Sequence, residues 1–152
     1  MSASQTLSFA DKAAITGVGE TVFVKGTERT AVDMMLEASR RAIADAGLKP
    51  SDIDGMVPPP IYTTSEEMAA NLGIDVLRYA ATVHMGGASP TTALQNAAMA
   101  IASGLCDHVL VWESGRSPTS PGESPGMFLA NFQCCSGRTK VPLEVTSDPL
   151  EP

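Results

Sequence analysis

The chain has 152 residues, of which 43% are hydrophobic and 18% are charged, which is the size and balance of one α/β domain with a single core. Its net charge of −7 and its ten scattered Lys and Arg residues argue against nucleic-acid binding, because no basic stripe is present to neutralise phosphates. No run of 18 apolar residues occurs, and the start "MSASQTLSFADK" lacks the features of a secretory signal. We therefore expect a cytoplasmic protein without a membrane span.

The first elements are predicted from short apolar runs and from the capping, glycine and proline residues at their ends. Residues 1–11 form a polar leader, and "KAAITGVG" (12–19) predicts a buried strand followed by a turn. "TAVDMMLEASRRAIADAG" predicts a helix, with Thr30 as its N-cap, Asp33 at position N3 and Gly47 as its stop. The dipeptide "MV" before "PPP" leaves room for only a very short strand, because prolines cannot donate ladder hydrogen bonds.

A second helix and a further strand follow. "SEEMAANLGI" predicts a short helix capped by Ser65 and ended by Gly73, with two acidic residues favourably placed in its first turn. "LRYAATV" (77–83) predicts the strand that leads into the stretch "VHMGGASP".

The segment after that stretch predicts a buried helix and a buried strand. Ser89 is the expected N-cap, Pro90 the first helical residue and Gly104 the stop. This helix is apolar on nearly all sides, so we expect it to be covered on more than one side. "HVLVW" (108–112) follows as an apolar strand typical of a parallel sheet, and Trp112 is expected to be core or interface area.

The alternation of strands and helices over residues 12–115 predicts an α/β fold with right-handed crossovers and a mostly parallel sheet. Beyond this segment, "SGRSPTSPGESPG" and the residues that follow it show no sustained period. We therefore expect residues 116–152 to be a loop-like or disordered tail.

Several residues are weighed as sites and given structural roles. "GVGETV" (17–22) has two glycines of a GxGxxG pattern but a valine at the third position, and the next helix starts too late to hold a pyrophosphate. A turn at a strand end is the favoured interpretation. His108 is expected to be a structural residue at a strand start. His84 lies at a strand end, where α/β proteins place ligands, but no neighbouring acid orients it.

The cysteines and Ser89 give no sign of nucleophilic or metal chemistry. Cys106, Cys134 and Cys135 form no CxxC spacing, so we expect thiols and no metal site. Cys106 is expected to pack as a small apolar residue. Ser89 does not stand in a GxSxG sequence, and the following proline suits a helix cap better than a nucleophile elbow.

Taken together, "AAITGVGET", "AIADAGLKPSDIDGMV", "LGI" and "MGGASPTTALQNAAMAIASGLCDHVLV" resemble the N-terminal part of thiolase-like proteins, in the lipid-transfer or acetyl-CoA acetyltransferase branch. The resemblance implies the N-terminal half of a layered αβαβα fold with a buried, Ala-rich helix. In that family the nucleophilic cysteine lies at or just before the start of this helix, in "VNxxCxSG". Here "VHMGGASP" places Gly87 at that position, so no catalytic residue is assigned and a cysteine thioester cannot form.

The resemblance also implies a site, a substrate class and partners. Gly86, Gly87, Ser89 and His84 are the expected substrate-binding residues, with backbone N–H groups at the helix start suited to a thioester carbonyl or carboxylate. Acyl-CoA is the expected substrate, no cofactor is expected to bind tightly, and a homodimer through the strand before the turn, or a hetero-oligomer, is expected. The family's C-terminal half is absent, which suggests that the tail reflects a truncated or frame-shifted gene.

Two functions remain open. The chain is either related to acyl-CoA acyltransferases or carbon–carbon lyases, in a truncated form without independent thiolase activity, or a non-catalytic scaffold subunit that completes a partner acyl-CoA enzyme. The lack of a catalytic cysteine in the isolated chain favours the scaffold, whereas the resemblance favours the enzyme. The sequence leaves the acyl chain unidentified.

Overall fold

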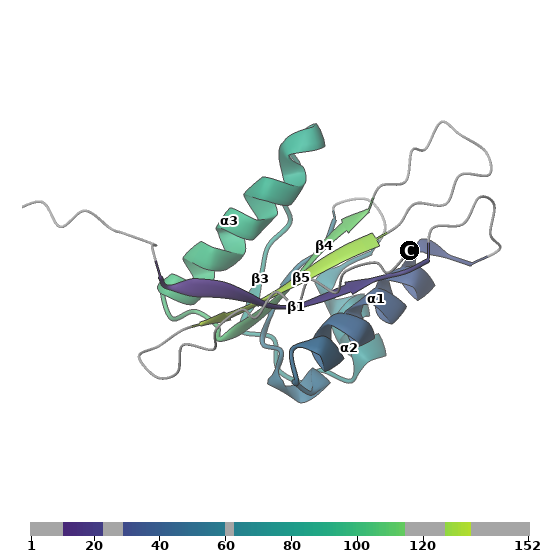
Figure 1. The fold of residues 1–152 in the computed structure, drawn as a ribbon, viewed down its shortest axis with the longest axis horizontal. Coiled ribbons are helices and arrows are strands. Elements are labelled where there is room, and N and C mark those ends of the chain that lie inside the picture. Colours follow the sequence, from purple (N-terminus) through teal and green to yellow (C-terminus); the bar gives the residue numbers. More distant parts are fainter. Residues whose placement is uncertain (1–10, 23–28, 60–62, 115–126, 135–152) are drawn as a thin grey trace, which may run out of the picture.

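The computed structural model describes residues 11–22, 29–59, 63–114 and 127–134, with side chains up to Trp112. Five described strands form one sheet in the order β1-β5-β4-β2-β3, and helices cover both of its faces (Figure 1). The strands are β1 Ala13–Glu20, β2 Gly55–Val57, β3 Tyr79–Ala80, β4 His108–Ser114 and β5 Met127–Cys134, the α-helices are α1 Ala31–Asp45, α2 Ser65–Leu72 and α3 Ser89–Ala102, and the 3-10 turns are η1 Pro50–Asp52 and η2 Gly86–Ala88.

The strand directions confirm the predicted α/β fold. β2 is parallel to both β3 and β4, while β5 lies antiparallel between β4 and β1, so the other four described strands run in one direction. The structure differs from the sequence prediction at β5, because Met127–Cys134 falls in the segment expected to be a loop-like tail. Two flanking strands satisfy its backbone hydrogen bonds, which compensates for the weak local pattern. The rest of residues 116–152 lies outside the described residues.

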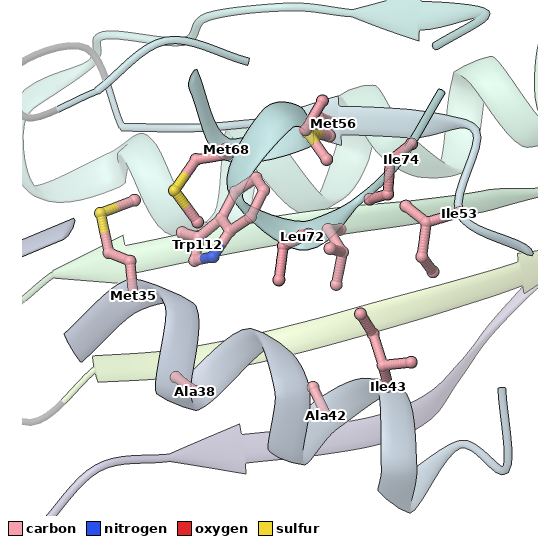
Figure 2. Close-up of a cluster of buried hydrophobic side chains, with 12 residues drawn as sticks. Met35, Ala38, Ala42, Ile43, Ile53, Met56, Met68, Leu72, Ile74 and Trp112 are labelled. Atoms are coloured by element: carbon pink, nitrogen blue, oxygen red, sulfur yellow. The ribbon is translucent and has the colours of Figure 1, made fainter. Parts of the chain in front are cut away.

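The sheet separates two apolar cores, because successive side chains along a strand point to opposite faces. Met56, Leu110 and Trp112 project toward α1 and α2, where they join the first core (Figure 2). The Trp112 Nε1 donates a 2.9 Å hydrogen bond to Ser39 Oγ, so this buried indole is satisfied. The first core is Met35, Ala38, Ala42, Ile43, Ile53, Met56, Met68, Ala69, Leu72, Ile74, Leu110 and Trp112.

The opposite face of the sheet carries α3 (Figure 1). Its small side chains let the helix approach β2 and β4 closely, and Cys106 is fully buried among them, as predicted. Met99 on the outer side of α3 is 49% exposed, so within the described residues the helix is covered on its sheet side and not on more than one side as expected. The second core is Val57, Ala93, Ala97, Ala100, Ile101, Cys106, Val109 and Val111.

The starts of α1 and α2 follow the predicted chemistry, with a shift of one residue at α2. The Thr30 hydroxyl accepts a 3.1 Å hydrogen bond from the Asp33 N–H and caps α1, as predicted. The cap of α2 is Thr64, whose hydroxyl accepts from the Glu67 N–H at 3.2 Å, whereas Ser65 is the first helical residue. The prediction for Ser65 was therefore wrong by one position, because two neighbouring hydroxyl residues suit a cap equally well.

The glycines of "GVG" lie inside β1 and not at its end, so the predicted strand-end turn is wrong. A Cβ at Gly17 would approach the Ala42 carbonyl oxygen closer than 3.0 Å, and one at Gly19 would approach that of Ala38 as closely. Both glycines therefore allow α1 to lie directly on β1, a packing role that leaves no phosphate-binding turn. None of the helices in the described part of the chain combines the length and hydropathy needed to span a bilayer.

Candidate functional site

The carboxyl ends of β2 and β3 open onto a cavity of about 330 Å³. The chain leaves β2, reaches α2 and contributes the start of that helix to one wall, while the end of β3 and the residues after it form the other wall. Parallel sheets place ligands at this end of their strands. The lining residues are Thr63, Thr64, Ser65, Glu66, Ala80, Ala81 and Thr82.

The cavity wall is polar and carries a carboxylate. The pKa of Glu66 is lowered because its carboxylate accepts hydrogen bonds from its own backbone N–H and from the Thr64 hydroxyl. The neighbouring Thr63 hydroxyl donates to the Glu67 carboxylate at 2.7 Å. This wall therefore presents hydroxyl groups and negative charge to a ligand.

The glycine-rich turn, residues 84–89, starts only two residues after Thr82. Gly86–Ala88 forms η2, and the Ala88 N–H donates to the Met85 carbonyl at 3.2 Å. Gly86 has φ +57°, a left-handed conformation that favours glycine. Among the described residues, none accepts a hydrogen bond from the N–H of Gly86 or Gly87, as is usual for the first N–H groups of a helical turn. These two donors remain available to an anionic ligand atom.

Ser89 lies one position further into α3 than predicted. The N-cap is Ala88, and Ser89 has helical angles because η2 continues directly into α3. The Ser89 hydroxyl accepts a 2.9 Å hydrogen bond from the Met85 N–H, and the Ser89 N–H donates to the Gly86 carbonyl. Both groups hold the turn together, and Pro90 accordingly stands at the second helical position.

Gly86 and Gly87 do not form a close backbone contact beneath α3. A Cβ built at either glycine meets no described atom within 4 Å, and both residues are exposed. His84 is also exposed. The structure therefore brings His84, Gly86, Gly87 and Ser89 together in one turn, with the first three on an open surface and Ser89 half-buried.

β3 is joined to α3 through Tyr79. Its hydroxyl donates to the Asn96 side-chain oxygen at 3.1 Å, and its ring packs on the second core. Burial raises the pKa of Tyr79, with a smaller contribution from the negative charge of Cys106 when that thiol is ionised. The bond fixes α3 relative to the strand that leads into the turn.

The other residues weighed from the sequence lie away from this turn. His108 begins β4 at the opposite end of the parallel strands, where it is half-buried and its Nδ1 has no hydrogen-bond partner among the described residues. The side chains of Cys134 and Cys135 lie outside those the structure describes. Within the described segments, no group of three or more His, Cys, Asp or Glu side chains is placed to hold a metal ion.

The cavity residues are not among the predicted site residues, although the sequence carries a signal for them. "TTSE" directly follows a strand and its proline loop, which places hydroxyl groups at the carboxyl edge of the sheet. The stretch was interpreted only as a helix start, because Ser and Thr are favoured caps. Ala80 and Ala81 carry no polar side chain, so only the fold shows that they form a wall.

No family model matches the chain. A steroid side-chain-cleaving aldolase of Thermomonospora curvata is 42% identical over 103 residues, which cover 67% of this chain and 26% of that protein. The 17-hydroxy-3-oxo-4-pregnene-20-carboxyl-CoA lyase of Mycobacterium tuberculosis is 38% identical over 104 residues, which cover 68% of this chain and 27% of that protein. The chain spans about a quarter of the length of these curated relatives.

Solved structures share the fold. An Ltp2-ChsH2(DUF35) aldolase matches with a TM-score of 0.69 and 35% identity, over 74% of this chain and 30% of that chain. The 3-oxoacyl-[acyl-carrier-protein] synthase III of Aquifex aeolicus matches with a TM-score of 0.67, over 85% of this chain and 55% of that chain. OleA of Xanthomonas campestris matches with a TM-score of 0.66, over 81% of this chain and 56% of that chain. The identities to the latter two are 17% and 13%, so these likenesses concern the fold alone. The chain has a thiolase-like fold, as the resemblance implied.

Proposed function

We propose that the chain is the N-terminal part of a thiolase-like carbon–carbon lyase that acts on acyl-CoA thioesters, with a steroid side-chain thioester as the substrate class. The two curated relatives, named for steroid side-chain cleavage and for a pregnene-carboxyl-CoA lyase, support this class over the acetyl-CoA acetyltransferase branch. One observation carries the proposal. The turn at the start of α3 has two N–H donors, at Gly86 and Gly87, that bind no described residue, while Gly87 offers no nucleophile.

A retro-aldol cleavage needs those donors and does not need a cysteine. A base removes the proton of a hydroxyl group β to the thioester carbonyl, and the new C=O bond forms as the bond between the α and β carbons breaks. The electron pair moves onto the thioester as an enolate, which is then protonated at carbon to give the acyl-CoA and a ketone. Charge therefore develops on the thioester oxygen, where positioned donors stabilise it.

In this proposal the N–H groups of Gly86 and Gly87 face the thioester oxygen, and the positive end of the α3 dipole adds to their field. Ser89 holds the turn through the Met85 N–H and is a positioning residue. His84 is placed as an exposed polar contact to the substrate. We assign the base to no residue described in this chain, and we expect acyl-CoA to be the substrate without a tightly bound cofactor.

Among the described strands, β3 lies at an edge of the sheet, and this position supports an oligomer. The N–H groups of Tyr79 and Ala81 donate to β2 or to Asp54 just before it, so those of Ala80 and Thr82 point outward. At the opposite edge of the sheet, the Asp45 carboxylate accepts from the Val18 N–H at 2.8 Å, and Arg41 donates to the Glu20 carbonyl at 2.7 Å. Edge strands blocked in this way do not add further strands. We therefore propose that subunits pair through β3, in a homodimer or with a related subunit.

The alternative is a scaffold subunit without activity of its own. It is favoured by the exposed apolar side chains on β1 and α3, such as Val18 and Met99, which a partner would cover. It is also favoured because no base is assigned within this chain. The two functions differ in one measurable respect, namely whether the chain turns over substrate.

The decisive experiment incubates the purified chain with 17-hydroxy-3-oxo-4-pregnene-20-carboxyl-CoA, alone and with a DUF35-type partner, and measures the released ketone by mass spectrometry. Turnover that falls at least tenfold in Gly87→Pro, which lacks the backbone N–H donor, and stays unchanged in the control Thr91→Ala supports the lyase. Turnover by the chain alone excludes the scaffold. The absence of both turnover and thioester binding, with and without the partner, overturns the lyase proposal.

A further inference from the structure

A cluster of charged side chains joins the amino ends of three neighbouring strands, far from the glycine-rich turn. Asp54 directly precedes β2, Arg78 directly precedes β3, and Asp107 directly precedes β4. Asp54 Oδ1 accepts hydrogen bonds from the Asp107 N–H at 2.9 Å and the His108 N–H at 2.8 Å. One partly buried carboxylate therefore satisfies two backbone donors at the start of β4.

Arg78 connects the same carboxylate to β3. Its Nη1 lies 3.1 Å from Asp54 Oδ2 and 3.2 Å from Asp107 Oδ2, and its Nη2 donates to the Gly104 carbonyl at 3.2 Å. The Asp54 carbonyl oxygen also accepts from the backbone N–H groups of Arg78 and Tyr79. Asp54 thus binds both the backbone and the side chain of Arg78.

These contacts matter because β3 has little else to hold its register. Only Tyr79 and Ala80 are paired with β2, and beyond them Ala81 adds one backbone bond, to Met56 at 3.1 Å. Register is strongly specified only where one face of a strand is buried, and neither Tyr79 nor Ala80 is fully buried. A slip of β3 would carry the residues that follow it, including the turn, away from the carboxyl edge of the sheet.

We propose that Asp54 and Arg78 are positioning residues, whose ion pair sets the register of β3 and thereby the place of the glycine-rich turn at the start of α3. Neither residue touches the turn itself. Their effect is transmitted along the chain from Arg78 through β3 to His84, and the Tyr79–Asn96 bond passes it to α3. The consequence for catalysis rests on the proposed function, whereas the consequence for strand register does not.

The test uses Asp54→Asn and Arg78→Met in the full chain. The asparagine keeps a carbonyl oxygen for the two backbone donors but turns an amide group toward Arg78, so it removes the ion pair selectively. Arg29→Gln is the matched control, since Arg29 also pairs with two carboxylates, those of Asp33 and Glu37, and its side chain is 41% exposed against 46% for Arg78. Arg78→Lys tests rescue, because a lysine still reaches Asp54 as a single donor.

Hydrogen exchange is measured at the amides of Tyr79, Ala81 and Met85, with the amides of α1 as the reference. We expect both disruptive variants to lower protection at these three amides about fivefold, the size of effect for one half-exposed ion pair, and Arg78→Lys to restore most of it. Unchanged protection, an equal loss in Arg29→Gln, or an equal loss throughout α1 would each overturn the proposal.

A second measurement separates this inference from the proposed function. Binding of the steroid CoA thioester should weaken in the same two variants and recover in Arg78→Lys. If exchange changes as expected but the unmodified chain binds no thioester, the proposed function fails and the role of the ion pair in strand register stands. If the chain binds thioester equally well in all variants while exchange changes, the link from register to the turn is wrong.

Discussion

Replacing Gly17 by alanine should destabilise the protein through a contact between β1 and α1. The added Cβ would lie 2.7 Å from the Ala46 backbone nitrogen and even closer to the Ala42 carbonyl oxygen. Both are backbone atoms of or next to α1, so no side chain can rotate away, and the helix must lift from the strand. Overpacking of this kind costs about 3 kcal/mol, which corresponds to a fall in Tm of roughly 6–12 °C for a chain of this length.

The assay is urea unfolding followed by fluorescence, because Trp112 is the single tryptophan and lies in the core that α1 covers. Gly87→Ala is the matched control, since its Cβ meets no described atom and its φ is not left-handed. That variant should be as stable as the unmodified chain, or up to about 1 kcal/mol more stable, because alanine restricts the unfolded chain. If Gly17→Ala unfolds at the same urea concentration as Gly87→Ala, the close approach of α1 to β1 is refuted.

Three further predictions concern other contacts. Ser39→Ala leaves the buried Trp112 Nε1 without its acceptor and should lower the free energy of unfolding by about 1–3 kcal/mol in the same assay, whereas no loss would show another acceptor. Asp45→Ala uncovers the Val18 N–H at the β1 edge and should cause concentration-dependent association in sedimentation. Asp45→Asn should not associate, because its amide oxygen still accepts the hydrogen bond from Val18. A monodisperse Asp45→Ala would contradict the edge-blocking role of Asp45. Because burial raises the pKa of Tyr79, its contribution to stability is complete below the unfolded value of about 10 and is lost as pH rises through the folded pKa. Tyr79→Phe should abolish that alkaline loss, and an unchanged alkaline pH dependence in the variant would exclude Tyr79 as its source.

Elements with a clear period and clear ends could be predicted from the sequence. The spacing of apolar residues in α1, its cap at Thr30 and the continuous apolar run of β4 each agree with the structure, because local propensity and tertiary packing favour the same conformation there. The helix cap at Ser89 was placed one residue off, since η2 runs into α3 without the extended residue that a serine cap requires.

Features that depend on distant parts of the chain could not be predicted. The sequence "GVG" is typical of a turn. Only the position of α1 shows that its glycines allow the helix to pack closely on β1. β5 is flanked by Ser, Pro and Gly residues and gains its conformation from β1 and β4. At the site, the turn could be located from its glycines, and "TTSE" indicated hydroxyl groups at the carboxyl edge of the sheet. Their position opposite Ala80, Ala81 and Thr82 could not be predicted, because it depends on where α2 lies relative to β3.

The position of β5 between β1 and β4 has a consequence for biosynthesis. In the described part of the sheet, β1 is hydrogen-bonded only to β5, and β5 begins 107 residues after β1 ends, at residue 127 against residue 20. At a translation rate of about 5–20 residues per second, the first strand waits roughly 5–20 s for its partner. During this interval the nascent chain exposes an unpaired apolar strand, so chaperone binding near the N-terminus, and aggregation of chains stopped before residue 127, are the expected signs of this strand order.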